Sequence, residues 1–285
     1  MKQIVVALEG GLGNQMFQYA AGRALALRTG TSLALDVRPL LRHGQRSYGL
    51  GDFQLSPGLE LLTVGSPLRV GRLRRLFRRL TGGEQTFREA SFAYDERISS
   101  AAAPIRLEGY FQSERYFADA AEALRTDLTP RLELLSAIDI LGERLLPPGP
   151  TLSLHVRRGD YANPATMAVH GLMAPEYYER ALRAVTERVG QVTVCVFTDE
   201  PAWVRANLRL PGETRFVSEH TQTALQDLVL MSRCTHHITA NSSFSWWGAW
   251  LNPRPDKVVI TPQQWFQPAA GLDTRDLRPA GWVKA

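Results

Sequence analysis

The chain has 285 residues, of which 44% are apolar and 21% are charged, as in an ordinary globular protein of one large or two modest domains. Its net charge of +5 alone fits a nucleic acid, a membrane surface or an anionic metabolite as partner. No run of about 18 apolar residues and no cleavable signal peptide are found in the sequence. Cys195 and Cys234 lie in apolar surroundings, which predicts buried free thiols and a cytoplasmic location.

The first residues predict a strand, a glycine loop and a helix. An apolar run at 3–8 precedes the loop 9–15, and helical spacing follows over 16–27. A second strand, at 32–35, ends at Asp36. Glycines in such a loop allow a ligand to approach the backbone, and the helix N-terminus offers free N–H groups.

The glycine loop approaches the dinucleotide fingerprint G-x-G-x-x-G without completing it. Gly11 and Gly13 match, but Met16 stands where close packing of helix on strand requires the third glycine. Three interpretations stay open. The loop is a tight structural turn, an anion or sugar site to which Asn14 contributes, or an NAD site that uses Asp36.

Residues 68–80 predict a helix with a distinctive charge pattern. One stripe of this helix is apolar, and six arginines cover or flank the rest: Arg69, Arg72, Arg74, Arg75, Arg78 and Arg79. Such a helix either lies on an anionic membrane surface or is a solvated helix packed on its own domain.

A proline-rich segment predicts the domain boundary. A strand that runs into a loop is expected at 105–112, and helices at 113–124 and 131–145. The segment that follows holds three prolines and a glycine, which continue neither helix nor strand. We therefore expect an N-terminal domain over 1–146, a linker at 147–150 and a C-terminal domain over 151–285.

Strands and helices alternate after the linker. The pattern predicts strands at 152–156, 192–197, 215–217, 236–240 and 257–260, with helices at 176–189, after Pro201, at 223–233 and through 246–250. This order is typical of an α/β fold with a mostly parallel sheet, and the first half has the same character.

Polar clusters follow three of these strands, at 157–160, 198–200 and 241–243. Because the carboxyl ends of parallel strands meet at one edge, the clusters predict a nucleotide pocket with arginine on the diphosphate. The alternative for Arg157 and Arg158 is a surface ion pair with Asp160. The sequence has neither a P-loop nor a D-x-D pair, so the arginines would neutralise a leaving diphosphate.

Three further features have a structural and a functional interpretation. Asp227 lies in an apolar helix, either on a solvated face or in a cleft where it contacts a base. His236 and His237 are adjacent on a strand and point to opposite faces, so they cannot chelate one metal ion together. The tryptophans at 246, 247 and 250 have the spacing of a helix core, and the alternative is a platform for a sugar.

Five stretches together resemble one family. They are Gly10 to Ala20, Gly109 to Glu114, His155 to Tyr161, Phe197 to Glu200, and Asp227 through Leu251. The chain resembles the inverting α-1,2-fucosyltransferases of glycosyltransferase family 11. The resemblance implies a GT-B fold, with two Rossmann-like domains of mostly parallel sheets facing across a cleft.

The resemblance also implies an activity. L-Fucose moves from GDP-β-L-fucose to the 2-hydroxyl of a terminal galactoside, in glycan, O-antigen or oligosaccharide synthesis. No cofactor or metal is expected, and no nucleic acid partner, since basic and aromatic residues do not interleave as in single-strand binders. The expected location is the cytoplasm, with peripheral attachment to the inner membrane if residues 68–80 bind it.

The family pattern assigns roles to individual residues. Arg157 binds the β-phosphate and, with Asp160, is expected to serve catalysis. The remaining donor-site residues are His155 and Asp227 on the guanosine, Ser242 and Ser243 on phosphate, Arg158 on the loop, Asp199, Asn241 and Phe244 around them, and Gly11, Gly13 and Asn14 from the other domain. The general base stays open among Asp160, Glu9 and a water molecule. The alternative function is an NAD-dependent oxidoreductase that uses the glycine loop.

Overall fold

The computed structural model describes residues 2–43, 47–64, 85–159, 161 and 163–285. By its internal contacts the chain forms two compact units. The first comprises Met1–Thr129 with Asp273–Leu277, and the second comprises Pro130–Leu272 with Arg278–Ala285. The predicted helix at 68–80 and the predicted site residue Asp160 lie outside the described residues.

The first unit is a parallel sheet in the order β3-β2-β1-β5-β4. Its described elements are β1 (Gln3–Ala7), α1 (Leu12–Thr29), β2 (Ser32–Asp36), α2 (Arg38–His43), β3 (Glu60–Leu62), β4 (Gln85–Arg88), β5 (Ile105–Glu108) and α4 (Ala121–Asp127). The predicted strand, loop and helix at the N-terminus are confirmed. The helix expected at 113–124 is instead two 3₁₀ turns, Glu114–Tyr116 and Ala118–Ala120, followed by α4.

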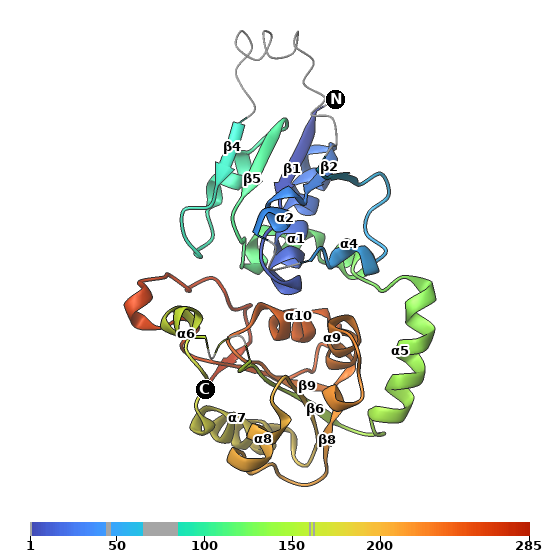
Figure 1. Cartoon of the computed structure of the whole chain (residues 1–285), viewed down its shortest axis with the longest axis vertical. Coiled ribbons are helices and arrows are strands. Elements are labelled where there is room, and N and C mark those ends of the chain that lie inside the picture. Colours follow the sequence, from blue (N-terminus) through green and yellow to red (C-terminus); the bar gives the residue numbers. More distant parts are fainter. Residues whose placement is uncertain (1, 44–46, 65–84, 160, 162) are drawn as a thin grey trace. The chain divides into compact units, whose positions relative to one another are not determined.

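The second unit is a six-stranded parallel sheet in the order β11-β10-β9-β6-β7-β8. Figure 1 shows α7 and α8 on one face of this sheet and α9 and α10 on the other. The elements are α5 (Leu132–Leu145), β6 (Thr151–Val156), α6 (Pro164–His170), α7 (Pro175–Val189), β7 (Thr193–Thr198), α8 (Pro201–Asn207), β8 (Thr214–Phe216), α9 (Ala224–Arg233), β9 (His236–Ile238), α10 (Ser243–Leu251), β10 (Val259–Thr261) and β11 (Val283–Lys284).

Both sheets reverse their strand order beside a central strand. In the second unit the chain runs from β6 outward through β7 and β8, then returns to β9 on the other side of β6. In the first unit it runs from β1 outward through β2 and β3, and β5 lies on the other side of β1. Ligands of open α/β sheets bind outside the carboxyl ends of strands at such reversals. The topology therefore marks the loops that follow β6 and β9, and those that follow β1 and β5.

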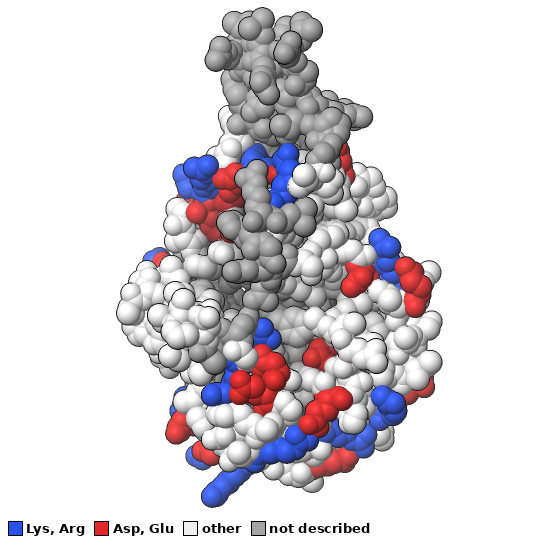
Figure 2. All heavy atoms as spheres, in the orientation of Figure 1, with Lys and Arg blue, Asp and Glu red and all other residues white. Residues whose placement is uncertain are grey.

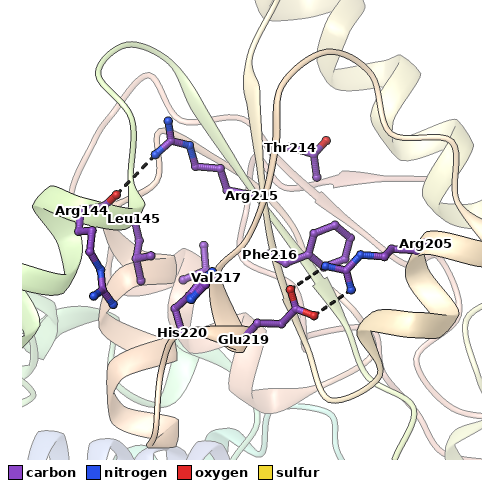
Figure 3. A pocket seen from close by; sticks show the side chains of 9 residues that line it. All are labelled: Arg144, Leu145, Arg205, Thr214, Arg215, Phe216, Val217, Glu219 and His220. Atoms are coloured by element: carbon purple, nitrogen blue, oxygen red, sulfur yellow. Dashed lines mark hydrogen bonds and ion pairs between the residues drawn. The ribbon is translucent and has the colours of Figure 1, made fainter.

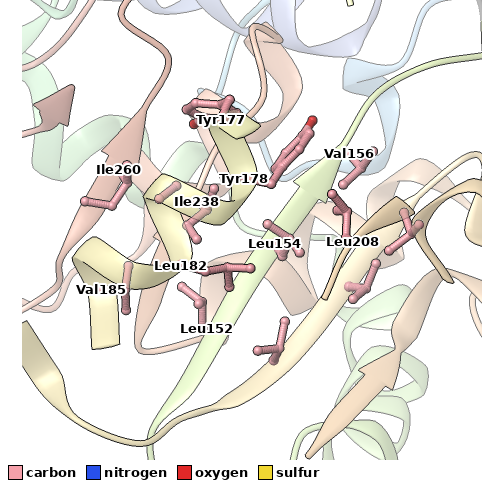
Figure 4. Packing of buried hydrophobic residues seen from close by; sticks show 14 of the residues in the cluster. Leu152, Leu154, Val156, Tyr177, Tyr178, Leu182, Val185, Leu208, Ile238 and Ile260 are labelled. Atoms are coloured by element: carbon pink, nitrogen blue, oxygen red, sulfur yellow. The ribbon is translucent and has the colours of Figure 1, made fainter. Parts of the chain in front are cut away.

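The strand β6 divides the interior of the second unit by alternation. Leu152, Leu154 and Val156 belong to the apolar cluster that α7 covers, as Figure 4 shows. The intervening side chains, Ser153 and His155, are buried on the opposite face. Buried polar groups need hydrogen-bond partners. Ser153 and His155 must therefore find theirs inside the protein or in a ligand.

Tight packing in the first unit requires a glycine in α1. A β-carbon at Gly22 would lie 2.3 Å from Cγ2 of Val6 and 3.0 Å from Cδ1 of Leu33, both in the sheet. Alanine in a helix interior normally stabilises by about 0.5–1 kcal/mol relative to glycine. Here we expect Gly22→Ala to destabilise by about 1–3 kcal/mol, because the overpacking of β1 and β2 outweighs that gain. Thermal or urea unfolding measures the change.

Gly51→Ala is the matched control for Gly22→Ala. The added methyl group there would meet the Tyr48 ring at 3.4 Å, an ordinary contact distance. We expect it to change the free energy of unfolding by less than about 0.5 kcal/mol. Equal stability of the two variants would contradict the packing argument.

The boundary between the units differs from the one expected at 147–150. The division falls between Thr129 and Pro130, so α5 belongs to the second unit. Arg233 of α9 fixes α5 there, because its guanidinium forms an ion pair with Asp139 and donates to the carbonyl oxygen of Ile138. Such contacts over more than 90 residues leave no local signature in the sequence.

The chain returns to the first unit near its C-terminus. Asp276 accepts hydrogen bonds from the backbone N–H of Tyr94 at 3.0 Å and from Nη1 of Arg115 at 3.0 Å. The Arg115 guanidinium lies 4.3 Å from the centre of the Tyr94 ring. Residues 278–285 then complete the second sheet through β11.

Candidate active site

The end of β6 places a neutral histidine in the interior. His155 is 5% exposed, and its ring lies 5.8 Å from that of Phe244 at the start of α10. Burial, with a smaller contribution from Arg157, lowers the pKa of His155 to about 3. The Nδ1 atom is buried and has no hydrogen-bond partner among the described residues. A buried polar atom of this kind is ready to bond with a ligand.

The two arginines that follow β6 have different surroundings. Nη1 of Arg157 lies 3.0 Å from Oδ2 of Asp199, and its side chain is 30% exposed. The Arg158 guanidinium lies 3.4 Å from Glu200 and 3.9 Å from the centre of the Trp203 ring. The side chains therefore diverge, as expected for alternating residues of an extended chain. Glu200 and Trp203 lie against Arg158, whereas Asp199 lies against Arg157.

The loop that follows β9 caps α10 with hydroxyl groups. Oγ of Ser242 accepts a hydrogen bond from the backbone N–H of Phe244 at 3.3 Å. Ser243 and Phe244 form the first turn of α10, where backbone N–H groups favour an anion. The site combines this helix N-terminus with the arginine that follows β6, on the two sides of the reversal in strand order.

Asn241, which stays a predicted donor contact, ties neighbouring loops together through its amide nitrogen. It is 1% exposed, and its Nδ2 donates to the carbonyl oxygens of His170 at 2.8 Å and Trp265 at 3.2 Å. Tyr161 donates its hydroxyl proton to the carbonyl oxygen of Asn241 at 3.2 Å. These bonds fix the loop before α10.

Asp227 is held by two hydroxyl groups. Ser218 donates to Oδ2 at 2.7 Å, and Thr221 donates to Oδ1 at 2.6 Å. Burial raises the pKa of Asp227, against the opposing effect of these hydrogen bonds. Ser218 also accepts from the backbone N–H of Thr198 at the end of β7. The solvated-face interpretation of Asp227 is therefore wrong. No pattern in the sequence points to Ser218 or Thr221, since hydroxyls in a turn are common.

The glycine loop of the first unit is braced internally. Gly10 has a φ of +77°, and a β-carbon there would lie 2.4 Å from Nδ2 of Asn14. Oδ1 of Asn14 accepts from Gln112 at 2.9 Å, and the buried Gln18 joins the backbone of Glu9 to that of Gly109. The loops that follow β1 and β5 are thus tied together. Gly11 precedes α1 as its N-cap residue, and Gly13 is buried in its first turn.

The geometry around Asp36 does not suit a dinucleotide. Its carboxylate forms ion pairs with Arg38 and with Arg106, at 2.6 and 2.9 Å, and only 2% of the residue is exposed. Burial alone would raise the pKa of Asp36, but the hydrogen bonds from the two arginines lower it. Met16 is fully buried where a fingerprint would have glycine. These contacts give Asp36 a structural role.

The remaining candidates are interior residues. The two adjacent histidines of β9 have different partners. His237 forms hydrogen bonds with Ser153 and Asn252, whereas His236 accepts one from the backbone N–H of Val258. Among the described residues no cluster of three or more His, Cys, Asp or Glu side chains could hold a metal ion. As predicted, the cysteines are buried free thiols and the three tryptophans of α10 belong to the core. In that same part of the chain no helix is long and apolar enough to cross a bilayer.

A separate pocket of about 580 Å³ lies on the edge strand β8 (Figure 3). Arg205 stacks 3.8 Å above the Phe216 ring and forms a two-fold ion pair with Glu219, while Arg215, which also lines the pocket, pairs with Glu213. Figure 2 shows basic and acidic side chains interspersed over the visible face of this unit. Arg205 and Arg215 are thus neutralised by carboxylates of the same unit.

Comparison with known proteins shows which family the chain resembles. The family model described as Glycosyl transferase family 11 matches residues 88–283. An alpha-1,2-colitosyltransferase of Escherichia coli is 34% identical over 100% of this chain and 99% of its own length. The O-antigen biosynthesis glycosyltransferase WbnK of the same species is 32% identical, over 97% of this chain and 98% of its own.

Solved fucosyltransferases share the fold. NodZ from Bradyrhizobium superposes with a TM-score of 0.55 at 17% identity, covering 91% of this chain and 94% of its own. Arabidopsis thaliana FUT1, solved as a mutant in complex with GDP, gives 0.52 at 13% identity over 99% and 76% of the two chains. The fold is thus of the GT-B type, with two parallel α/β sheets, and the comparisons give no support to an oxidoreductase. The chain belongs to glycosyltransferase family 11.

Proposed function

We propose that the protein is an inverting glycosyltransferase that moves L-fucose from GDP-β-L-fucose to the 2-hydroxyl group of a terminal galactoside. The observation that carries the proposal is the position of Arg157 at the reversal in strand order, two residues after the buried His155, whose ring lies 5.8 Å from that of Phe244 in the first turn of α10. An arginine and a helix N-terminus are the groups that bind a diphosphate. Membership of family 11 supports the sugar chemistry.

In the proposed reaction the acceptor oxygen attacks C1 of fucose as the bond from C1 to the β-phosphate oxygen breaks. The electron pair leaves with GDP, and the acceptor proton passes to a base, for which Asp160, Glu9 and water remain candidates. The single displacement inverts the β-linked donor to an α-linked product. Negative charge grows on the diphosphate, so Arg157 and the N-terminal N–H groups of α10 stabilise the transition state. Neutral His155 and Asp227 are proposed to bind the guanosine.

We propose that transfer requires no divalent metal, because arginine supplies the charge that a metal-bound D-x-D pair supplies elsewhere. Activity in excess EDTA is therefore expected to stay within about two-fold of the untreated enzyme. Initial rates of GDP release, with and without added Mn²⁺ or Mg²⁺, measure the effect. Loss of activity with EDTA and its recovery with Mn²⁺ would overturn this part of the proposal.

A second donor is favoured by one comparison. The colitosyltransferase relative transfers colitose, a 3-deoxy counterpart of L-fucose, so GDP-colitose is a candidate donor. Turnover of GDP-fucose and GDP-colitose against a panel of terminal galactosides separates the two, and NMR of the product assigns the linkage. A preference for GDP-colitose would replace the donor and keep the mechanism. A product linked elsewhere than at the 2-hydroxyl would contradict the proposed linkage.

A cytoplasmic location and contact of residues 68–80 with an anionic membrane stay predictions. A galactose-terminated oligosaccharide stays the proposed acceptor.

A further inference from the structure

Asp199 follows β7 directly and reaches the first residues that follow the neighbouring strand β6. The two strands are paired to their ends, with Val156 opposite Thr198. Oδ2 of Asp199 lies 3.0 Å from Nη1 of Arg157, and Oδ1 accepts the backbone N–H of Arg158 at 3.1 Å. One carboxylate thus holds both a side chain and the backbone of the loop that carries the catalytic arginine.

The next residue of the loop leaves space for this carboxylate. A β-carbon at Gly159 would lie 2.7 Å from Oδ2 and 3.2 Å from Cγ of Asp199. Both members of the ion pair are partly shielded, with side-chain exposures of 30% for Arg157 and 27% for Asp199. Three consecutive residues are therefore arranged around the same carboxylate, which goes beyond what an incidental surface ion pair requires.

The charge of Asp199 argues against a direct contact with the diphosphate. A carboxylate beside the site of an anionic leaving group repels it, unless the carboxylate acts through a cation. We propose that Asp199 is a positioning residue that aims the Arg157 guanidinium at the leaving diphosphate, and that it does not bind the donor itself. This inference rests on the proposed function, and it reassigns Asp199 from the donor contacts expected from sequence.

The proposal predicts that loss of the Asp199 charge lowers kcat without weakening the binding of GDP. Asp199→Asn keeps an acceptor for the backbone N–H of Arg158 and removes the charge that orients Arg157. We expect kcat to fall about 10-fold or more, since a preorganised charge contributes mainly in the transition state. The Kd of GDP should stay the same or decrease, because a repelling charge is lost. A direct contact of Asp199 with the ribose or base would instead raise the Kd of GDP along with the loss of rate.

Two further variants make the test specific. Gly159→Ala crowds the carboxylate without changing its charge and is expected to reproduce the fall in kcat. In an Arg157→Ala background, Asp199→Asn is expected to cost less than about two-fold, because a residue that acts through Arg157 has nothing left to orient. Glu213→Gln, which breaks an ion pair with Arg215 on the edge strand, is the control for loss of one acidic charge and should leave kcat unchanged.

The experiment combines GDP-fucose turnover with calorimetric titration of GDP for the wild type and these variants. A parallel loss of rate and GDP affinity in Asp199→Asn, or additive effects of the two substitutions, would overturn the proposal. Failure of the wild-type enzyme to turn over GDP-fucose while it binds GDP would instead reject the proposed sugar. Melting temperatures of the variants exclude unfolding as the cause.

Discussion

Replacement of Arg157 by alanine is expected to reduce transfer by more than about 100-fold. The removal of one preorganised donor to a developing negative charge typically costs 10²–10³ in kcat. The nearby Arg158 does not replace it, because Glu200 and Trp203 hold its guanidinium. Initial rates at saturating donor and acceptor measure the loss, with circular dichroism to show that the variant is folded.

Two companions define what Arg157 contributes. Arg157→Lys keeps a positive charge without the planar fork of donors. Its rate of transfer should lie between those of Arg157→Ala and the wild type. Arg215→Ala removes an arginine on the edge strand β8 and should leave the rate unchanged. Near wild-type turnover in Arg157→Ala would show that the leaving diphosphate is stabilised by other groups.

Acidification is expected to destabilise the protein steeply, because buried histidines, His155 and His237 above all, are held in the neutral form. Burial lowers the pKa of His155 to about 3 and that of His237 well below its ordinary value. In the unfolded chain both take up protons below about pH 6.5, whereas in the folded protein they do not. Each histidine then lowers the free energy of unfolding by up to about 1.4 kcal/mol per pH unit. Together the slope approaches about 3 kcal/mol per pH unit.

Urea unfolding at several pH values between about 7 and 4 measures this slope. His155→Gln and His237→Gln should each remove up to half of the contribution that these two residues make, and His236, whose pKa burial also lowers, adds its own. Asp227 acts in the opposite direction, since its raised pKa favours proton uptake by the folded state. An unaltered slope in both buried-histidine variants would show that these residues do not control acid stability.

The sequence could predict the elements whose residues decide their own structure. The run at 152–156 is a fully buried strand, and the segment 176–189 forms α7 almost as expected. That the polar residues after β6, β7 and β9 lie along one edge of the sheet could be predicted, because the carboxyl ends of parallel strands meet there. Short edge strands such as β3 and β4 could not be predicted, since three or four residues gain their structure from the neighbour they pair with.

The partners of the site residues were beyond prediction for the same physical reason. The contact between Asp199 and Arg157 joins residues 42 positions apart, and that between Asn241 and His170 joins residues 71 apart. Asp227 illustrates the point: its helix suggested a solvated face or a cleft, and only the fold brings Ser218 and Thr221 to its two oxygens. Alternation along the extended chain that follows β6, by contrast, could already separate the two arginines.

The return of residues 273–277 to the first unit restricts how enzymes of this kind can be recombined. A chimera that takes its second unit from one relative by a single crossover near residue 130 would also import that relative's 273–277 segment. The imported segment would then lie against Tyr94 and Arg115 of this chain, and not against the residues that it contacts in the relative. A functional exchange of halves needs three crossovers, two of them around a segment of five residues. The same connectivity means that neither half can be excised intact with a single cut.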